Sequence, residues 1–165
     1  MRKLLIPLCL LVGCITPGYQ PHGSVVTIRQ RTSIGTGVVI GENLVITASH
    51  VVDEPGYIKL RLSKNPLKRY TEFRKLAEIS HDRENIVALY GPWEFSPTMI
   101  FKVGCDSPPF MIQTRRGLFE LTEYTPQGGD SGSAVMCEHG HLVGVHWGSR
   151  TYSTRKEPLF LLFKD

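Results

Sequence analysis

Short apolar stretches separated by turn residues run along most of the chain, and none of them has the period of an amphipathic helix. Residues 58–62 alternate between apolar and basic side chains, which is typical of a strand with one buried face. Other stretches are rich in β-branched residues and are bounded by Gly, Pro or Asn. The predicted strands are 25–30, 37–40, 44–47, 58–62, 71–79, 86–90, 99–103, 110–114, 118–124, 133–137, 142–147 and 159–163. Many short strands with such punctuation predict an all-β sandwich or barrel.

The N-terminus has the order of an export signal. Arg2 and Lys3 precede an apolar run from Leu4 to Val12, which is too short to span a bilayer. The run ends in Gly13 and Cys14, an order that resembles the lipobox of bacterial lipoproteins. That resemblance implies a signal peptide over 1–13, lipidation of Cys14 and a tether over 14–22. The protein is then exported and membrane-anchored in the bacterial cell envelope; the alternatives are an ordinary secretory signal with a secreted product, or a buried strand with a chance cysteine.

Length and charge limit the remaining possibilities. The chain has 165 residues and is 41% hydrophobic, which suits one globular domain over 23–165. Glycine and proline near residues 91–97 divide it into halves of about 23–91 and 97–165. The formal charge of +4 falls to +2 when the two basic residues of the leader are removed. This charge is too small and too scattered to predict a nucleic-acid partner.

Two cysteines remain in the domain, Cys105 and Cys137. In an exported protein they are compatible with a disulfide, and two buried free thiols are the alternative. Three histidines, His81, His139 and His141, have no spacing typical of a zinc site. We therefore expect neither a metal nor a cofactor.

The most informative stretch is Gly128–Val135, in which Ser131 stands between glycines and before an apolar strand. Glycines permit positive φ and close approach of the backbone to a substrate. The amides of Gly129 and Ser131 are then candidates for an oxyanion hole around a nucleophilic serine. A glycine-rich hairpin turn explains the same glycines equally well.

Two further motifs decide between these interpretations. Thr47-Ala48-Ser49-His50 follows an apolar strand, and the segment 143–149 reads Val-Gly-Val-His-Trp-Gly-Ser. With Gly-Asp-Ser-Gly around Ser131, these motifs resemble the chymotrypsin-fold (trypsin-like) serine peptidases over about residues 23–163. The resemblance implies two packed six-stranded antiparallel β-barrels with the active site in the cleft between them. It also implies that Ser131 is the nucleophile and His50 the general base, acting on protein or peptide substrates.

The third member of the expected triad departs from the family pattern. The family places an aspartate directly before an apolar strand, and a gapless match puts Asn85 in that position. Asparagine can orient an imidazole but cannot stabilise the imidazolium, and an Asp-to-Asn change costs about 10⁴ in turnover in the best-studied triad. Asp82 lies three residues earlier and supplies the charge if the strand entry is shifted. Glu84 is a third candidate.

Substrate preference is indicated by His146, Trp147 and Gly148, which resemble the Gly-Ile-His-Trp-Gly strand of staphylococcal glutamyl endopeptidases. In that family the histidine and a threonine bind an acidic side chain before the scissile bond, and viral relatives use a similar pair for glutamate or glutamine. Here Pro126 occupies the expected threonine position and Thr125 is one residue early. Without the resemblance, a histidine next to a tryptophan is typical of a packed core.

The sequence thus predicts a serine endopeptidase that forms an acyl-enzyme and cleaves after Glu or Gln. The alternative is a catalytically weak or inactive relative that keeps the cleft and binds peptides. Asn85 favours the alternative, whereas the serine and histidine motifs favour the enzyme, because a binding protein has no chemical need for them. Neither the oligomeric state nor the physiological substrate follows from the sequence.

Overall fold

The computed structural model describes residues 25–52, 58–61, 68–70, 74–81, 84–91, 94–152 and 155–163. The leader, Cys14, the tether and Asp82 lie outside these ranges, so the predictions for them stay predictions. Within the described ranges, no helix has the length and apolar character required to cross a bilayer.

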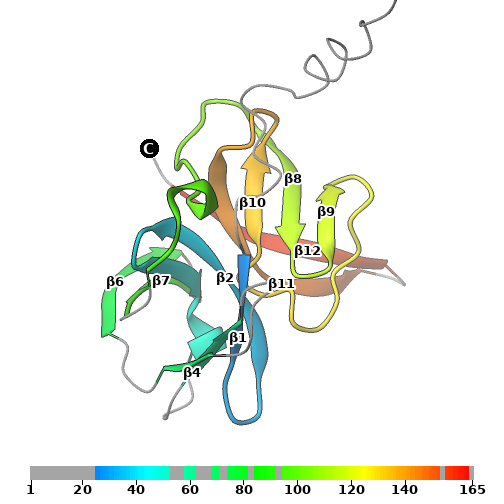
Figure 1. The fold of residues 1–165 in the computed structure, drawn as a ribbon. Coiled ribbons are helices and arrows are strands. Elements are labelled where there is room, and N and C mark those ends of the chain that lie inside the picture. Colours follow the sequence, from blue (N-terminus) through cyan, green and yellow to red (C-terminus); the bar gives the residue numbers. More distant parts are fainter. Residues whose placement is uncertain are drawn as a thin grey trace, which may run out of the picture.

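The first sheet contains seven strands in the order β5-β4-β1-β2-β3-β7-β6, and every neighbouring pair is antiparallel. It curls into the lower left part of the molecule in Figure 1. A 3₁₀ turn, η1 (Ser49–Val52), follows the third strand. The strands are β1 (Val25–Arg29), β2 (Ile34–Gly41), β3 (Leu44–Ala48), β4 (Ile58–Arg61), β5 (Lys68–Tyr70), β6 (Arg74–His81) and β7 (Glu84–Tyr90).

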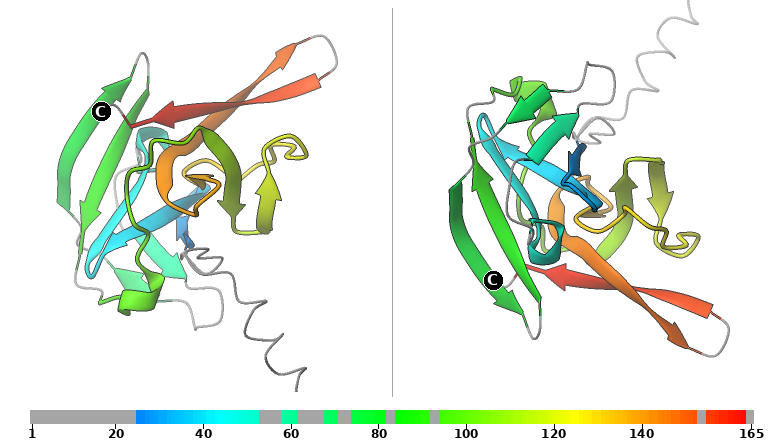
Figure 2. Two further views of the ribbon diagram at one scale, coloured as in Figure 1. Left: turned by 90° about the horizontal axis from the view of Figure 1, so that it is seen from above. Right: turned by 90° about the horizontal axis from the view of Figure 1, so that it is seen from below.

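The second sheet contains five strands in the order β12-β11-β10-β8-β9, again antiparallel throughout. Its strands are β8 (Pro109–Thr114), β9 (Gly117–Glu120), β10 (Ala134–Cys137), β11 (Leu142–Tyr152) and β12 (Arg155–Leu162). The two longest of these strands, β11 and β12, pair with each other and extend away from the rest of the molecule (Figure 2). A register shift between His146 and Gly148 makes Trp147 the residue at a bulge in this hairpin.

The two sheets share one hydrophobic core. Val38, Ile46 and Ile86 of the first sheet pack in the same cluster as Met136, Val145 and other residues of the second sheet. Trp147 lies against this cluster and also against the one inside the first sheet. Because buried apolar side chains connect the sheets directly, the relative position of the two halves is held by packing as well as by the backbone.

The chymotrypsin-like double-barrel class predicted from the sequence is confirmed. The described strands divide seven and five between the two sheets rather than six and six. The strand of the first sheet that was not predicted is β5 (Lys68–Tyr70). Its residues are polar and carry no alternating pattern, but it pairs with β4 nevertheless.

The strand predicted over 99–103 is wrong. Its first part belongs to a 3₁₀ turn, η2 (Pro97–Met99), whose N-cap is Ser96. Only Val103 makes a bridge to a strand residue, Leu142. A serine followed by proline starts a helical turn, because the serine side chain accepts from a free amide and proline has no amide to leave unpaired.

Candidate active site

The loop before β10 holds Ser131 in a compact turn. The amide of Asp130 donates to the carbonyl of Gln127 at 3.1 Å, and the amide of Ser133 donates to the carbonyl of Asp130 at 3.0 Å. Gly129 and Gly132 have φ of +91° and +94°, a region that residues with a Cβ rarely adopt. Ser131 is half-buried at this turn, and its hydroxyl donates to the carbonyl of Trp147 at 3.1 Å.

Hydrogen bonds tie this loop to the first sheet. The amide of Thr36 on β2 donates to the carbonyl of Ser131 at 2.8 Å, and the Thr36 hydroxyl donates to the carbonyl of Gly129 at 2.9 Å. The hydroxyl of Thr47 on β3 donates in turn to the carbonyl of Thr36 at 2.7 Å. Both threonine side chains are fully buried. Since His50 follows Thr47 by three residues, one chain of hydrogen bonds connects the serine loop to the strand end that carries the histidine.

Gly132 lies against the first sheet with no room for a side chain. A Cβ at this position would overlap the carbonyl oxygen of Thr36 and crowd the hydroxyl of Thr47. Gly132→Ala is therefore expected to displace the serine loop and to lower the free energy of unfolding by at least about 2 kcal/mol, because positive φ alone costs a residue with a Cβ about 1–2 kcal/mol. Chemical denaturation measures the change.

Gly128→Ala is the matched control. A Cβ at Gly128 meets no atom within 4 Å, and this glycine is not among those with positive φ. The control is expected to change stability by less than about 0.5 kcal/mol. Equal stabilities of the two alanine variants would contradict the close approach at Gly132.

His50 lies in η1, immediately after β3, and is exposed. The pairing of β3 with β7 ends at Ala48 and Ile86, so Asn85 and Ser49 are the next positions at the same end of the two strands. The backbone of Asn85 is paired on its other side with Ser80 of β6. The strand register therefore places Asn85 beside the turn that holds His50, while Asp82 lies outside the described residues.

A cation lies beside Gly129 of the proposed oxyanion hole. Among the described residues, the amides of Gly129 and Ser131 donate no backbone hydrogen bond. The guanidinium of Arg115 occupies the space that a side chain at residue 129 would need. An oxyanion between the two amides would gain from a nearby positive charge as well as from the two donors.

Asp130, directly before the serine, is fully buried and well partnered. Its carboxylate accepts from Arg116 Nη2 at 2.7 Å and Nε at 3.3 Å, from the Tyr124 hydroxyl at 2.7 Å and from the Gln127 amide at 3.0 Å. Burial by itself raises the pKa of Asp130, but the hydrogen bonds from Arg116, Tyr124 and Gln127 outweigh it and hold the pKa below its usual value. Burial and the bond to Asp130 raise the pKa of Tyr124, so its hydroxyl remains a donor.

This network makes the stability of the protein pH-dependent. Because the pKa of Asp130 is lower in the folded protein than the value of about 3.9 in an unfolded chain, its stabilisation is complete above pH 4 and is lost as the pH falls through the folded pKa. Arg116→Met should cost about 2 kcal/mol at pH 7, the contribution of hydrogen bonds to a charged group. The deficit relative to the unmodified protein should shrink below pH 4, as measured by denaturation at a series of pH values.

Arg31→Met is the control for this experiment, since Arg31 is exposed in the turn between β1 and β2. It should leave stability unchanged at every pH. A constant deficit for Arg116→Met from pH 7 to pH 3 would show that packing, and not the charge on Asp130, explains its effect.

His146 on β11 is 2% exposed and is held by the serine loop. Its Nδ1 lies 3.2 Å from the carbonyl oxygen of Asp130, and its backbone exchanges hydrogen bonds with Gly132 and Ser133. The ring packs edge-on against Tyr124, with centroids 5.6 Å apart, and against Phe160 at 5.9 Å. Its Nε2 is buried with no hydrogen-bond partner among the described residues.

The surroundings of His146 favour the neutral imidazole. Burial lowers its pKa, the carbonyl groups of Asp130 and Gly148 oppose this effect, and the charge on His50 lowers the pKa further. Since a carbonyl oxygen only accepts, the neutral ring carries its proton on Nδ1 and presents a lone pair at Nε2.

The structure also describes the three other predicted substrate-binding residues, Trp147, Gly148 and Thr125. Trp147 and Gly148 are half-buried next to His146, and a side chain at Gly148 would enter open space. Thr125 is exposed, and its carbonyl accepts from Arg116 at 3.3 Å. Thr125 thus contributes its backbone to the network around Asp130 rather than a hydroxyl to His146.

Sequence reasoning missed Arg116 and Tyr124, which hold the carboxylate of Asp130 next to the predicted nucleophile. It also missed Thr36 and Thr47, which connect the serine loop to the first sheet. No local motif marks these residues. The only signal was indirect: a buried-type aspartate at 130 requires a cation or several donors somewhere in the chain.

Cys105 and Cys137 form a disulfide, one of the two alternatives that the sequence left open. The bond joins the segment between η2 and β8 to the last residue of β10. It encloses a loop with a sequence separation of 32 residues, for which loop-closure entropy predicts a stabilisation of about 3–4 kcal/mol. His141 lies beside the two sulfurs, although its spacing from them gave no sign of a ligand group.

The trypsin family model matches residues 15–94, just under half of the chain and a stretch that includes His50 but not Ser131. A Glu endopeptidase in complex with MPD superposes with a TM-score of 0.61 at 16% identity, covering 87% of this chain and 87% of that one. The active form of the Rv3671c protease from M. tuberculosis gives 0.60 at 18% identity, over 86% of this chain and 76% of that one. A human pathogenic astrovirus serine protease gives 0.59 at 18% identity, over 87% and 91%. No curated protein sequence matches the chain.

At these identities the likeness to solved structures establishes the fold and no more. The protein has the chymotrypsin-like fold of two packed antiparallel β-barrels. The structures to which it is similar are named as proteases, and its N-terminal half matches the trypsin family.

Proposed function

We propose that the protein is a serine endopeptidase. Ser131 Oγ attacks the carbonyl carbon of the scissile peptide bond while His50 accepts its proton, and His50 then returns the proton to the leaving amine. The amides of Gly129 and Ser131 stabilise the oxyanion of the tetrahedral intermediate. Water releases the acyl group from the serine by the same steps in reverse order.

One observation carries this proposal: the hydrogen bonds from Thr36 and Thr47 that join the serine loop to the strand end before His50. They fix two loops from different sheets to a common point, which a plain hairpin turn would not require. In the described conformation the hydroxyl of Ser131 donates to the carbonyl of Trp147. Attack requires a rotation about the serine χ1 that transfers this hydroxyl to His50, as is common between free and substrate-bound enzymes.

Fluorophosphonate labelling of the full chain tests the proposal, because this probe reacts with an activated serine and leaves a phosphonyl group on it. Labelling of Ser131, located by peptide mass, is the expected result. A chain that binds peptides and is not labelled would support the second candidate, an inactive relative of the same fold. The asparagine at residue 85 favours that candidate, since no carboxylate then stands at this position behind His50.

We also infer the chemistry of the specificity pocket from His146. A neutral ring with its proton on Nδ1 presents an acceptor at Nε2, and this matches the side-chain NH₂ of glutamine. A carboxylate of glutamate has no proton to donate, so it pairs with His146 only when the ring is protonated.

The Cys105–Cys137 disulfide supports the export that the leader predicts, because disulfides persist in oxidising compartments.

The expected result is a pH-dependent preference. Cleavage after glutamine should exceed cleavage after glutamate by about 10–100-fold at pH 8, the cost of an unmatched buried polar pair. The ratio should fall as the pH decreases below about 6.5, because the lowered pKa of His146 places its protonation there. Paired peptides that differ at this one residue measure the ratio of kcat/KM.

His146→Leu provides the control, since it removes the titrating ring and should make the ratio independent of pH. A preference for glutamate at pH 8 in the unmodified protein would contradict the tautomer. Labelling of Ser131 would be unaffected by such a result, so the specificity proposal fails separately from the proposal of peptidase activity.

A further inference from the structure

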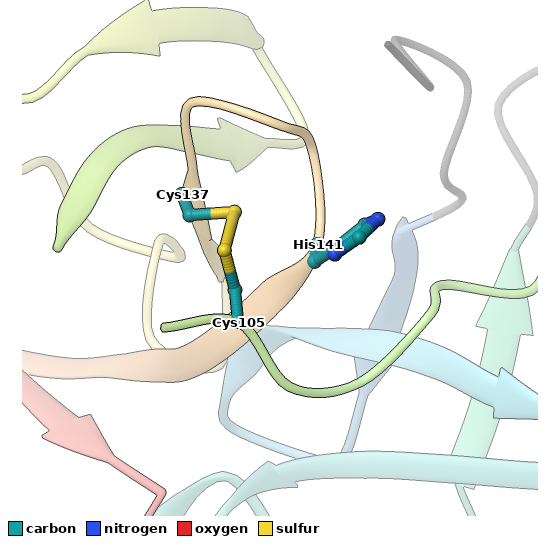
Figure 3. A group of neighbouring side chains, drawn as sticks. All are labelled: Cys105, Cys137 and His141. Atoms are coloured by element: carbon teal, nitrogen blue, oxygen red, sulfur yellow. A yellow bond between two sulfur atoms is a disulfide. The ribbon is translucent and has the colours of Figure 1, made fainter. Parts of the chain in front are cut away.

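Four side chains of types that bind soft metals lie near the end of β10 that is away from the serine loop. Cys105 comes from the segment before β8, Cys137 ends β10, and His139 and His141 lie in the hairpin that leads into β11. Figure 3 shows the disulfide between the two cysteines with His141 beside it. Ser131 lies before the opposite end of β10, so this cluster takes no part in the proposed catalysis.

The donor atoms are close together. Those of Cys105, Cys137 and His141 all lie within 4.8 Å of one another. Nδ1 of His139 lies 3.7 Å from the sulfur of Cys105 and 3.9 Å from the sulfur of Cys137. In a tetrahedral zinc site with bonds of about 2.3 Å to sulfur and 2.0 Å to nitrogen, the sulfur-to-nitrogen separation is about 3.5 Å. Closing the cluster around one ion requires the two sulfurs to separate on reduction and the rings of His139 and His141, whose centroids are 6.3 Å apart, to turn toward a common point.

Backbone hydrogen bonds already hold the segments that carry these residues. The amide of Gly104 donates to the carbonyl of Leu142 at 2.8 Å, and the amide of Leu142 donates to the carbonyl of Lys102 at 2.8 Å. The amide of Cys137 donates to the carbonyl of His141 at 3.0 Å, which closes the hairpin. Because the main chain is fixed on both sides, the four side chains remain near one another whether or not the sulfurs are bonded.

Access for an ion is also present. A shallow depression of about 600 Å³ is lined by Cys105, His139 and His141, with Lys102, Gly104, Asp106 and Ser107 around them. Cys137 is fully buried, His141 and Cys105 are half-buried, and His139 is exposed. This gradient is typical of a structural metal site with an entry path from solvent.

We propose that Cys105, Cys137, His139 and His141 bind one Zn²⁺ ion when the disulfide is reduced. A two-electron thiol or phosphine reductant converts the disulfide, with two protons, into two thiols. Zn²⁺ then displaces both thiol protons and binds two thiolates and two neutral imidazoles, a Cys₂His₂ set in a closed tetrahedral site. A small-molecule disulfide reoxidises the two thiolates to the protein disulfide, is itself reduced to two thiolates, and so releases the ion. The disulfide and the metal are thus two alternative cross-links between the segment before β8 and the end of β10.

Cobalt binding tests the site, because Co²⁺ occupies zinc sites and gives visible absorption when it is tetrahedral and thiolate-bound. The full chain is reduced with a phosphine under nitrogen and titrated with Co²⁺, and Zn²⁺ is then used to displace the cobalt. One equivalent should bind with a thiolate-to-cobalt charge-transfer band, and Zn²⁺ should raise the melting temperature of the reduced chain. The oxidised chain should show neither effect. Absence of the band or of the thermal shift in the reduced chain would overturn the proposal, as would equal binding by the oxidised chain.

Histidine variants assign the ligands without altering the disulfide, so their folding can be checked in the oxidised state. His141→Ala and His139→Ala should each weaken zinc binding by at least about 100-fold. His81→Ala, which removes a histidine from β6 of the other sheet, should bind as the unmodified chain does. Unchanged affinity in His141→Ala would overturn the site, unchanged affinity in His139→Ala would overturn the four-ligand set, and loss of binding in His81→Ala would place the ion elsewhere.

Discussion

Replacing Ser131 with alanine is expected to abolish fluorophosphonate labelling and to reduce turnover by about 100-fold, since loss of the nucleophile costs about 10⁶ in a complete triad and an asparagine in place of the aspartate already removes about 10⁴ of that. The free energy of unfolding should change by no more than about 1 kcal/mol, because the hydroxyl makes a single hydrogen bond to the carbonyl of Trp147. Mass spectrometry of the labelled chain and peptide hydrolysis measure the first two effects.

Ser149→Ala is the matched serine control, because Ser149 is exposed on β11 and lies beyond the bulge at Trp147. It should retain both labelling and turnover. Labelling that survives in Ser131→Ala, or that is lost in Ser149→Ala, would show that the nucleophile has been assigned to the wrong residue.

The second large effect is expected from a gain of charge. Asn85→Asp should raise turnover by at least about 100-fold, towards the limit of about 10⁴ that the opposite change costs in a complete triad. The β3–β7 register places residue 85 beside the turn of His50, where a carboxylate stabilises the imidazolium formed during attack. The gain should appear in kcat more than in KM, because the charge acts on the transition state.

Two further variants separate the alternatives. Asp82→Asn and Glu84→Gln should change turnover little if residue 85 stands behind His50. A loss of several orders of magnitude in Asp82→Asn, with no gain in Asn85→Asp, would make Asp82 the orienting acid; the same loss in Glu84→Gln would assign Glu84. If none of the three changes turnover, His50 is oriented by a group that has not been identified.

Buried Asp130 shows why some partners escape sequence reasoning. The motif around Ser131 predicts an aspartate at this position, but it does not say what neutralises the carboxylate. The cation comes from Arg116, at the turn between β8 and β9, which reaches Asp130 only because β10 pairs with β8. That contact depends on strand register, which local patterns of hydrophobic and polar residues do not encode.

His146, the residue proposed for the specificity pocket, illustrates the same limit. The motif around His146 can be recognised in the sequence, and its resemblance to glutamyl endopeptidases and viral relatives suggests a role in binding glutamate or glutamine. The tautomer follows only from the position of the Asp130 carbonyl relative to Nδ1, and the lowered pKa only from burial against Tyr124 and Phe160. Neither quantity belongs to the segment that contains His146.

By itself the sequence determined the all-β class, most strand positions and the order of the serine and histidine motifs. Alternation of apolar and polar residues, runs of β-branched residues and glycine turns each depend on a few consecutive residues, so they can be recognised in the sequence alone. The tertiary structure decided the pairing of polar β5, the turn at Pro97–Met99 and the threonine bonds that join the two sheets. It also brings Cys105 together with Cys137, His139 and His141. These features require residues far apart in the chain to meet, and their meeting depends on register and core packing over the whole domain.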